Sequence, residues 1–159
     1  MKTRASMTTD ASLLRLRLRS VFDTLDLVQV VSDHVAVLSG LDEDGVHWLG
    51  VAVRESVINA IKHGNRQDLA KHVEVEFAFQ AAASPPELIV SVTDEGEGFE
   101  PQGVGDPLAP ENILKSSGRG IFFMKSFMDE VVIARRAAGG MEVRLVKHLP
   151  GVPAFLRKP

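Results

Sequence analysis

The sequence predicts one α+β domain, a two-layer sandwich in which a mixed, mainly antiparallel sheet lies under helices. Three observations predict it. The chain has 159 residues, the size of one ordinary domain. Segments in which apolar and polar residues alternate, as in strands, accompany segments with the apolar period of three to four that is typical of helices. Their order is strand, two helices, two strands, a Gly- and Pro-rich segment, helix and two strands, which indicates an α+β sandwich.

The first expected elements are a strand and two helices. Leucine and arginine alternate from Leu14 to Arg19, which predicts a half-buried strand with a basic solvent face. Apolar residues recur every three or four positions from Phe22 to about Leu41, which is the spacing of a helix. A second helix is expected from Asp42 or Glu43 to His63, because acidic residues suit its positive N-terminal end and Gly64 follows as a stop.

The second half of the chain is expected to complete the sheet. Strands are predicted at Val73 to Gln80, Leu88 to Thr93, Glu130 to Arg136 and Met141 to His148, with a short helix from Gly120 to about Phe127. The Gly-, Pro- and Ser-rich stretch from Gly96 to Gly118 is expected to be a mobile lid, since an irregular segment of this length in a compact domain is usually functional. We expect a single domain over residues 1–159, with its core at about 13–148 and flexible tails at 1–11 and 150–159.

Composition argues against several classes of protein. A net charge of -3 is unlike that of a nucleic-acid-binding domain, which needs a basic patch. There are no cysteines, so disulfides and zinc–thiolate sites are excluded. No stretch approaches the roughly 18 consecutive apolar residues of a membrane span. The polar start of the chain lacks the apolar core of a secretory signal. We therefore expect a cytoplasmic protein with no nucleic-acid or membrane partner.

Two polar residues four positions apart, Glu55 and Asn59, share one face of the second predicted helix. Magnesium prefers oxygen ligands and keeps several waters, so one Asn amide oxygen together with nucleotide phosphates suits it. A nearby carboxylate can orient a nucleophile and accept its proton. Taken alone, the pair is also consistent with an ordinary solvated helix face.

An acidic, glycine-rich segment, D-E-G-E-G-F, begins with Asp94 where the second strand of the middle pair ends. An ionised Asp only accepts hydrogen bonds, so Asp94 can accept one from the exocyclic amine of adenine and discriminate against guanine. Gly96 and Gly98 allow positive φ and a close approach of the backbone to a ligand. The alternative is an ordinary acidic β-turn.

A third segment, S-S-G-R-G, precedes the short predicted helix and contains Ser117, Gly118 and Gly120. Free amides at a helix start, together with a glycine-built nest, form a site for phosphate. Lys115 and Arg119 add positive charge for the β- and γ-phosphates. A helix N-cap without a ligand is the alternative. The segment is not a Walker A motif, because G-x-x-x-x-G-K-[ST] is absent.

Taken in order, E-S-V-I-N-A-I-K-H-G-N, D-E-G-E-G-F and G-R-G-I-F-F-M-K-S-F-M-D-E resemble the N, G1 and G2 boxes of the ATPase superfamily that includes gyrase and the histidine kinases. The resemblance is to its small stand-alone branch, the anti-sigma factor serine/threonine kinases, over roughly Leu14 to His148. It implies the Bergerat-type ATP-binding fold, with ATP or ADP and Mg²⁺ bound.

The resemblance also implies a role for each matching residue. Glu55 is implied as the general base, Asn59 as the magnesium ligand and Asp94 as the adenine acceptor. The implied ATP-binding residues are Asn59, Lys62, His63, Asp94, Gly96, Gly98, Phe99, Lys115, Ser117, Gly118, Arg119, Gly120 and Ile121. Kinases of this branch phosphorylate a serine or threonine of a STAS-domain anti-anti-sigma factor, hold a sigma factor when that partner is phosphorylated, and are typically homodimers.

Three functions stay open on the sequence. The first is an active protein kinase that regulates a sigma factor, which the intact Glu55 favours. The second is a nucleotide-sensing binding module that switches partners without transferring phosphate. The third is a partner-switch kinase whose output is not a sigma factor.

Overall fold

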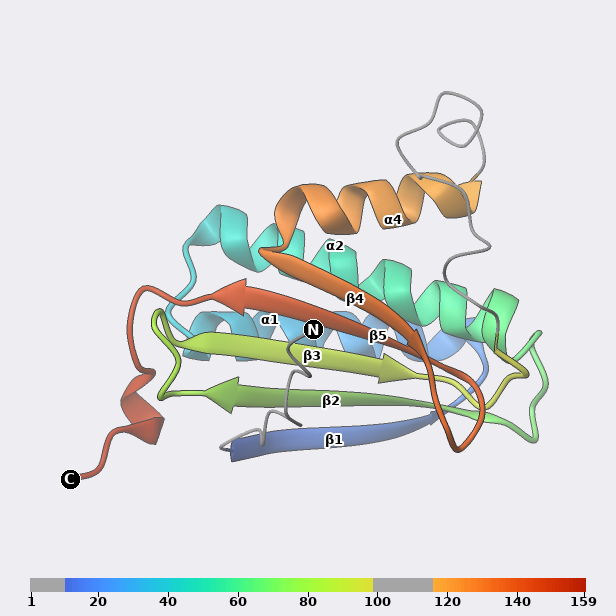
Figure 1. The fold of residues 1–159 in the computed structure, drawn as a ribbon, viewed down its shortest axis with the longest axis horizontal. Coiled ribbons are helices and arrows are strands. Elements are labelled where there is room, and N and C mark those ends of the chain that lie inside the picture. The colour runs from blue at the N-terminus through green and yellow to red at the C-terminus, as the bar shows by residue number, and fades with distance from the viewer. Residues whose placement is uncertain (1–10, 99–115) are drawn as a thin grey trace, which may run out of the picture.

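The fold was obtained as a computed structural model, which describes residues 11–98 and 116–159, with the side chains of residues 116–119 and 121 excepted. The predicted lid at Gly96 to Gly118 falls mostly outside the described residues, as do Phe99 and Lys115. Figure 1 shows a sheet in front of a layer of helices. Within the described part of the chain, no helix combines the length and apolarity needed to cross a membrane.

The sheet has five strands in the order β1-β2-β3-β5-β4. The strands are β1 Ala11–Arg19, β2 His72–Gln80, β3 Glu87–Thr93, β4 Glu130–Arg135 and β5 Met141–His148. Neighbouring strands are antiparallel at each of the pairings between described strands. The α+β sandwich is confirmed, and it differs from the expected mixed sheet in having no parallel pair among these strands.

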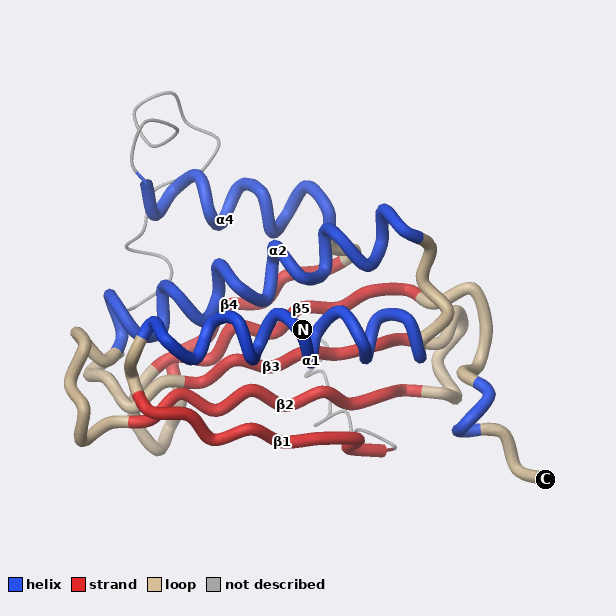
Figure 2. The backbone as a smooth tube through the Cα atoms, turned by 180° about the vertical axis from the view of Figure 1, so that it is seen from behind, coloured by secondary structure: helices blue, strands red, loops and turns tan. Residues whose placement is uncertain are grey.

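The helices cover one face of the sheet, as the view from behind shows (Figure 2). They are α1 Leu25–Leu38, α2 Glu43–Asn59 and α4 Ser116–Phe127, with a 3₁₀ turn at Phe22–Thr24 before α1 and another at Ala154–Leu156. Helix α2 lies between α1 and α4 and packs against both. Helix α2 is therefore the central helix of this layer.

The core lies between these two layers. Its largest fully buried side chains include Phe77 and Phe79 of β2, Leu88 of β3 and Leu49 of α2. Strand β2 alternates buried apolar with more exposed acidic residues over much of its length, since successive side chains point to opposite faces of a sheet. The same alternation in β1 faces Leu14, Leu16 and Leu18 toward the core and its arginines toward solvent, as the sequence predicts.

Most predicted elements are found with small shifts at their ends. The single helix expected from Phe22 to about Leu41 is a 3₁₀ turn followed by α1. The helix expected to begin at Gly120 begins at Ser116, about one turn earlier. The helix expected to continue to His63 ends its α-helical part at Asn59 and continues as a π turn over Ala60–Gly64.

Candidate functional site

Helix α2 presents Glu55 and Asn59 on the side away from its buried stripe of Leu49, Val53 and Val57. The helix begins at its N-cap Asp42, whose carboxylate accepts a hydrogen bond of 2.8 Å from the Gly45 N–H. Glu55 is partly buried and Asn59 is the last α-helical residue.

The Glu55 carboxyl is half shielded from water. Burial raises its pKa above the ordinary value of 4.5, while the nearby charges of His63 and Lys62 oppose that rise. A carboxylate with a raised pKa beside a polar helix end is a candidate general base.

After Asn59 the chain makes a π turn, in which the Asn65 N–H donates to the Ala60 carbonyl at 2.8 Å. The wider turn ends the helix with Gly64 against the end of β3. A Cβ at Gly64 would overlap the carboxylate of Asp94, so the two residues are in direct contact. π turns of this kind are frequent at functional sites.

Asp94 follows β3 directly and is 5% exposed. Its Oδ1 accepts hydrogen bonds from the backbone N–H groups of Gly96, at 2.9 Å, and Met141, at 3.2 Å. Its own N–H donates to the Met141 carbonyl at 3.1 Å, which extends the β3–β5 ladder by one residue. The carboxylate is therefore held in one orientation by two amides, with its Oδ2 against Gly64.

The two glycines of the acidic segment serve different purposes. Gly96 lies so close to the end of the π turn that a Cβ there would overlap the carbonyl group of Gly64. Gly98 has a φ of 76°, in the left-handed region that favours glycine. Of these two glycines, Gly98 has the positive φ that glycine allows, whereas Gly96 is required by the close approach to Gly64.

Helix α4 lies along α2 and reaches the same site. A Cβ at Gly120 would overlap the Glu55 carboxyl group, so this glycine lets α4 pack directly on the acidic side chain. Further along, Ser56 Oγ lies 3.0 Å from Met124 Sδ. The rings of Trp48 and Phe127 stack at 3.6 Å between centroids.

The C-terminal half of α2 and its π turn thus contact both other predicted segments. Glu55 meets Gly120 of α4, and Gly64 meets Asp94 and Gly96 after β3. Segments far apart in sequence are brought to one end of the two-layer domain.

Several predicted residues have other positions. Lys62 and His63 lie on the π turn and are exposed. Residues 117, 118 and 119 lie within α4, so the expectation that they precede the helix is wrong. Residue 121 lies within the helix, as expected. Ser117 and Gly118 nevertheless belong to the first turn, whose amides have no partner within the helix.

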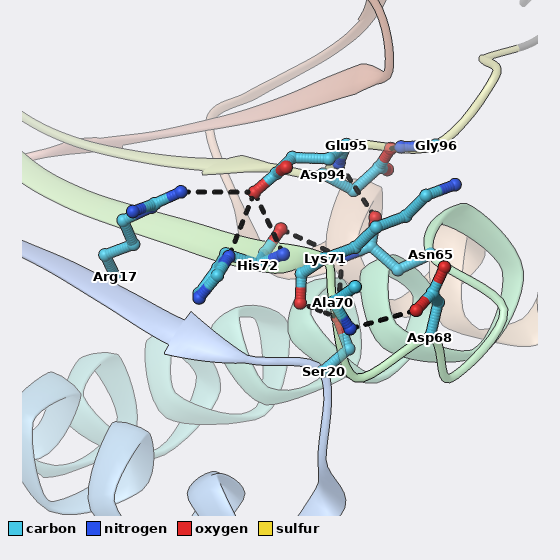
Figure 3. Close-up of polar contacts among 10 residues, drawn as sticks. All are labelled: Arg17, Ser20, Asn65, Asp68, Ala70, Lys71, His72, Asp94, Glu95 and Gly96. Atoms are coloured by element: carbon cyan, nitrogen blue, oxygen red, sulfur yellow. Dashed lines mark hydrogen bonds and ion pairs between the residues drawn. The ribbon is translucent and has the colours of Figure 1, made fainter.

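Asn65, to which the sequence assigned no role, is 1% exposed and joins three chain segments (Figure 3). Its Nδ2 donates to Ser20 Oγ at 2.7 Å and to the His72 carbonyl at 2.9 Å. Its Oδ1 accepts from the Glu95 N–H at 2.8 Å. The sequence signals are an Asn directly after the helix-ending Gly64 and its place as the last residue of the first quoted motif.

The residues present can be compared with what a metal ion needs. The described residues contain no group of three or more His, Cys, Asp or Glu side chains that could hold a metal by themselves. Magnesium does not need such a cage, because it is usually bound through one or two protein oxygens together with waters and substrate phosphates. The amide oxygen of Asn59, four residues from Glu55 on one helix face, fits that partial role.

Comparison with known proteins gives consistent matches over most of the chain. The histidine kinase-like ATPase domain family matches residues 23–147. Serine-protein kinase RsbW of Bacillus subtilis is 28% identical over 152 residues, which cover 91% of each chain. Serine-protein kinase RsbW of Staphylococcus epidermidis is 25% identical over 142 residues, or 86% of each chain, and that of Staphylococcus aureus is 23% identical over the same length.

Proposed function

Because the chain belongs to the family of histidine kinase-like ATPase domains, we propose that it is an ATP-dependent protein serine/threonine kinase. Its relatives named serine-protein kinase RsbW support this proposal. The acceptor is a serine or threonine of a STAS-domain anti-anti-sigma factor. The chain holds a sigma factor when that STAS partner is phosphorylated. The protein acts in the cytoplasm as a homodimer.

Adenine binds at Asp94. Two backbone amides fix Oδ1, and contact with Gly64 fixes the position of Oδ2. A carboxylate held in this way accepts the N–H of the exocyclic amine of adenine, whereas the carbonyl oxygen of guanine offers no donor there. Asp94 therefore sets the preference for ATP over GTP.

Glu55 is the general base of the transfer. The acceptor hydroxyl oxygen forms a bond to the γ-phosphorus as the bond from that phosphorus to the β,γ-bridging oxygen breaks, and ADP leaves with the electron pair. The hydroxyl proton passes to the Glu55 carboxylate. Such transfers depend chiefly on positioning and charge neutralisation, and one carboxylate on a rigid helix suits that requirement. The raised pKa of Glu55 makes it a stronger base than an exposed carboxylate.

Asn59 would hold Mg²⁺ through its amide oxygen. When bound, the ion neutralises phosphate charge. The chain's contributions are the Asn59 oxygen and, from the first turn of α4, amides available to phosphate oxygens.

The observation that supports this function most strongly is the contact of one helix end with both other motifs. Glu55 touches Gly120, and Gly64 touches Asp94, so a base, an adenine acceptor and a phosphate-binding helix start face one region. A nucleotide-sensing module needs the last two features but has no use for a half-buried Glu55.

The test is phosphorylation of any STAS-domain protein encoded beside the gene for this chain, using labelled ATP and magnesium. We expect phosphoserine or phosphothreonine on the STAS protein, and loss of that label with Glu55→Gln. The matched control is Glu43→Gln, which changes an exposed glutamate on the same helix. ATP binding without any transfer would favour the nucleotide-sensing module instead.

A further inference from the structure

Asn65 ties the end of α2 to the strand end that presents Asp94. It lies directly after the π turn, and its backbone N–H donates a hydrogen bond to the Ala60 carbonyl. Its side chain is buried, so each of its polar atoms requires a partner inside the protein. The three partners belong to the residue after β1, the start of β2 and the residue after Asp94.

The contact that matters for the nucleotide is the one with Glu95. Asn65 Oδ1 accepts the Glu95 N–H at 2.8 Å, and this N–H belongs to the peptide unit that follows Asp94. The Glu95 side chain is held as well, since its Oε1 accepts the His72 N–H at 2.9 Å (Figure 3). The Asp94–Glu95 peptide is therefore fixed from outside the sheet ladder, and with it the direction of the Asp94 side chain.

We propose that Asn65 is a positioning residue for adenine recognition, acting through the Asp94–Glu95 peptide. The inference rests on the proposed function, because it assumes that Asp94 accepts the exocyclic amine of adenine. Without the Oδ1 acceptor, the Glu95 N–H lacks its buried partner and the peptide can rotate. Rotation moves the Asp94 carboxylate relative to Gly64 and weakens selection of the amine.

The network contains a control that separates positioning from stability. Ser20 Oγ accepts from Asn65 Nδ2 and donates to the Lys71 carbonyl at 2.9 Å. Neither of these hydrogen bonds involves Glu95 or Asp94. Ser20→Ala therefore disturbs the same buried cluster at its far end. It leaves the Asn65 Oδ1 to Glu95 N–H bond in place.

The experiment measures Kd by calorimetry for ATP and for purine riboside triphosphate, which lacks the exocyclic amine. The wild-type chain is expected to prefer ATP at least tenfold. Asn65→Leu, which keeps the side-chain size without an acceptor, is expected to reduce that preference to about threefold or less. Asn65→Ala provides a second acceptor-free variant if the leucine variant does not fold. Ser20→Ala is expected to lower Tm but to keep the wild-type preference.

Each outcome decides the inference. A wild-type preference that persists in both acceptor-free Asn65 variants overturns the positioning role while leaving the proposed function intact. An equal loss of preference in Ser20→Ala also overturns it, because the effect would then come from general loosening of the cluster. If the wild-type chain binds neither nucleotide, the proposed function and this inference both fail.

Discussion

Replacing Gly96 by alanine should test how closely the acidic segment approaches α2. A Cβ at Gly96 would overlap the carbonyl group of Gly64 and would lie 3.1 Å from Asp94 Oδ1. Because the obstacle is backbone, the segment itself must move, and the 2.9 Å bond from the Gly96 N–H to Asp94 Oδ1 is strained or lost. A hydrogen bond to a charged group contributes about 1.5–3 kcal/mol. If this free energy is lost from ATP binding, Kd for ATP rises roughly 10- to 150-fold.

The same overlap should lower stability. Overpacking in a well-packed region costs about 1–3 kcal/mol, which for a domain of this size corresponds to a fall in Tm of roughly 2–12 °C. Gly151→Ala is the matched control, because a Cβ there has no heavy atom within 4 Å. Calorimetric titration with ATP and a thermal melt would check both effects. If Gly96→Ala has the same Kd for ATP and the same Tm as Gly151→Ala, the inferred close approach of Gly96 to Gly64 is wrong.

Three further changes have definite expected outcomes. Asp94→Asn should weaken ATP binding at least tenfold by calorimetry, since the amide can present a donor to the adenine amine; unchanged affinity would remove Asp94 from the adenine site. Glu55→Gln should slow transfer by about 10²- to 10⁴-fold with little change in ATP affinity. The wild-type rate should fall with acid through a pKa above 4.5, because only the ionised carboxylate accepts a proton. Burial penalises the ionised form of Glu55, so the stabilisation associated with its raised pKa is lost as pH rises through that pKa. At pH 7 the Glu55→Gln variant should therefore have a Tm no lower than that of the wild-type chain. Phe77→Ala, at a fully buried position of β2, should cost about 3–5 kcal/mol and lower Tm by roughly 6–20 °C; a drop under 2 °C would contradict the core assignment.

The elements that the sequence predicts well are those with a strong local pattern. The alternation around Leu16 and the stripe that includes Val53 each depend on neighbouring residues alone, and both are found. The end of α2 was harder to predict, because the π turn at Ala60–Gly64 depends on contact with Asp94, far along the chain. Periodicity contains no information about that contact.

In the candidate site too, residues within local motifs could be predicted and residues placed by distant contacts could not. Glu55 and Asp94 stand out as acidic residues in motifs, although their roles remain predictions. Asn65 could not be identified as more than a helix-ending residue, because its partners Ser20, His72 and Glu95 are brought together only by the folded sheet. Gly96 was predicted to allow positive φ and a close approach of the backbone to a ligand, whereas the close approach found is to the backbone of Gly64.

The pairing of β1 with β2 has a consequence for how the domain forms. Ala11 lies opposite Phe79, so this pairing closes a long loop that contains both first helices, whereas β2–β3 and β4–β5 are joined by short connections. Loop closure costs chain entropy, and distant pairings are the slow ones in folding. We expect the two hairpins to form first and β1 to dock late. Because docking of β1 also delivers Ser20 to Asn65, competence to bind adenine should be regained after most of the secondary structure during refolding.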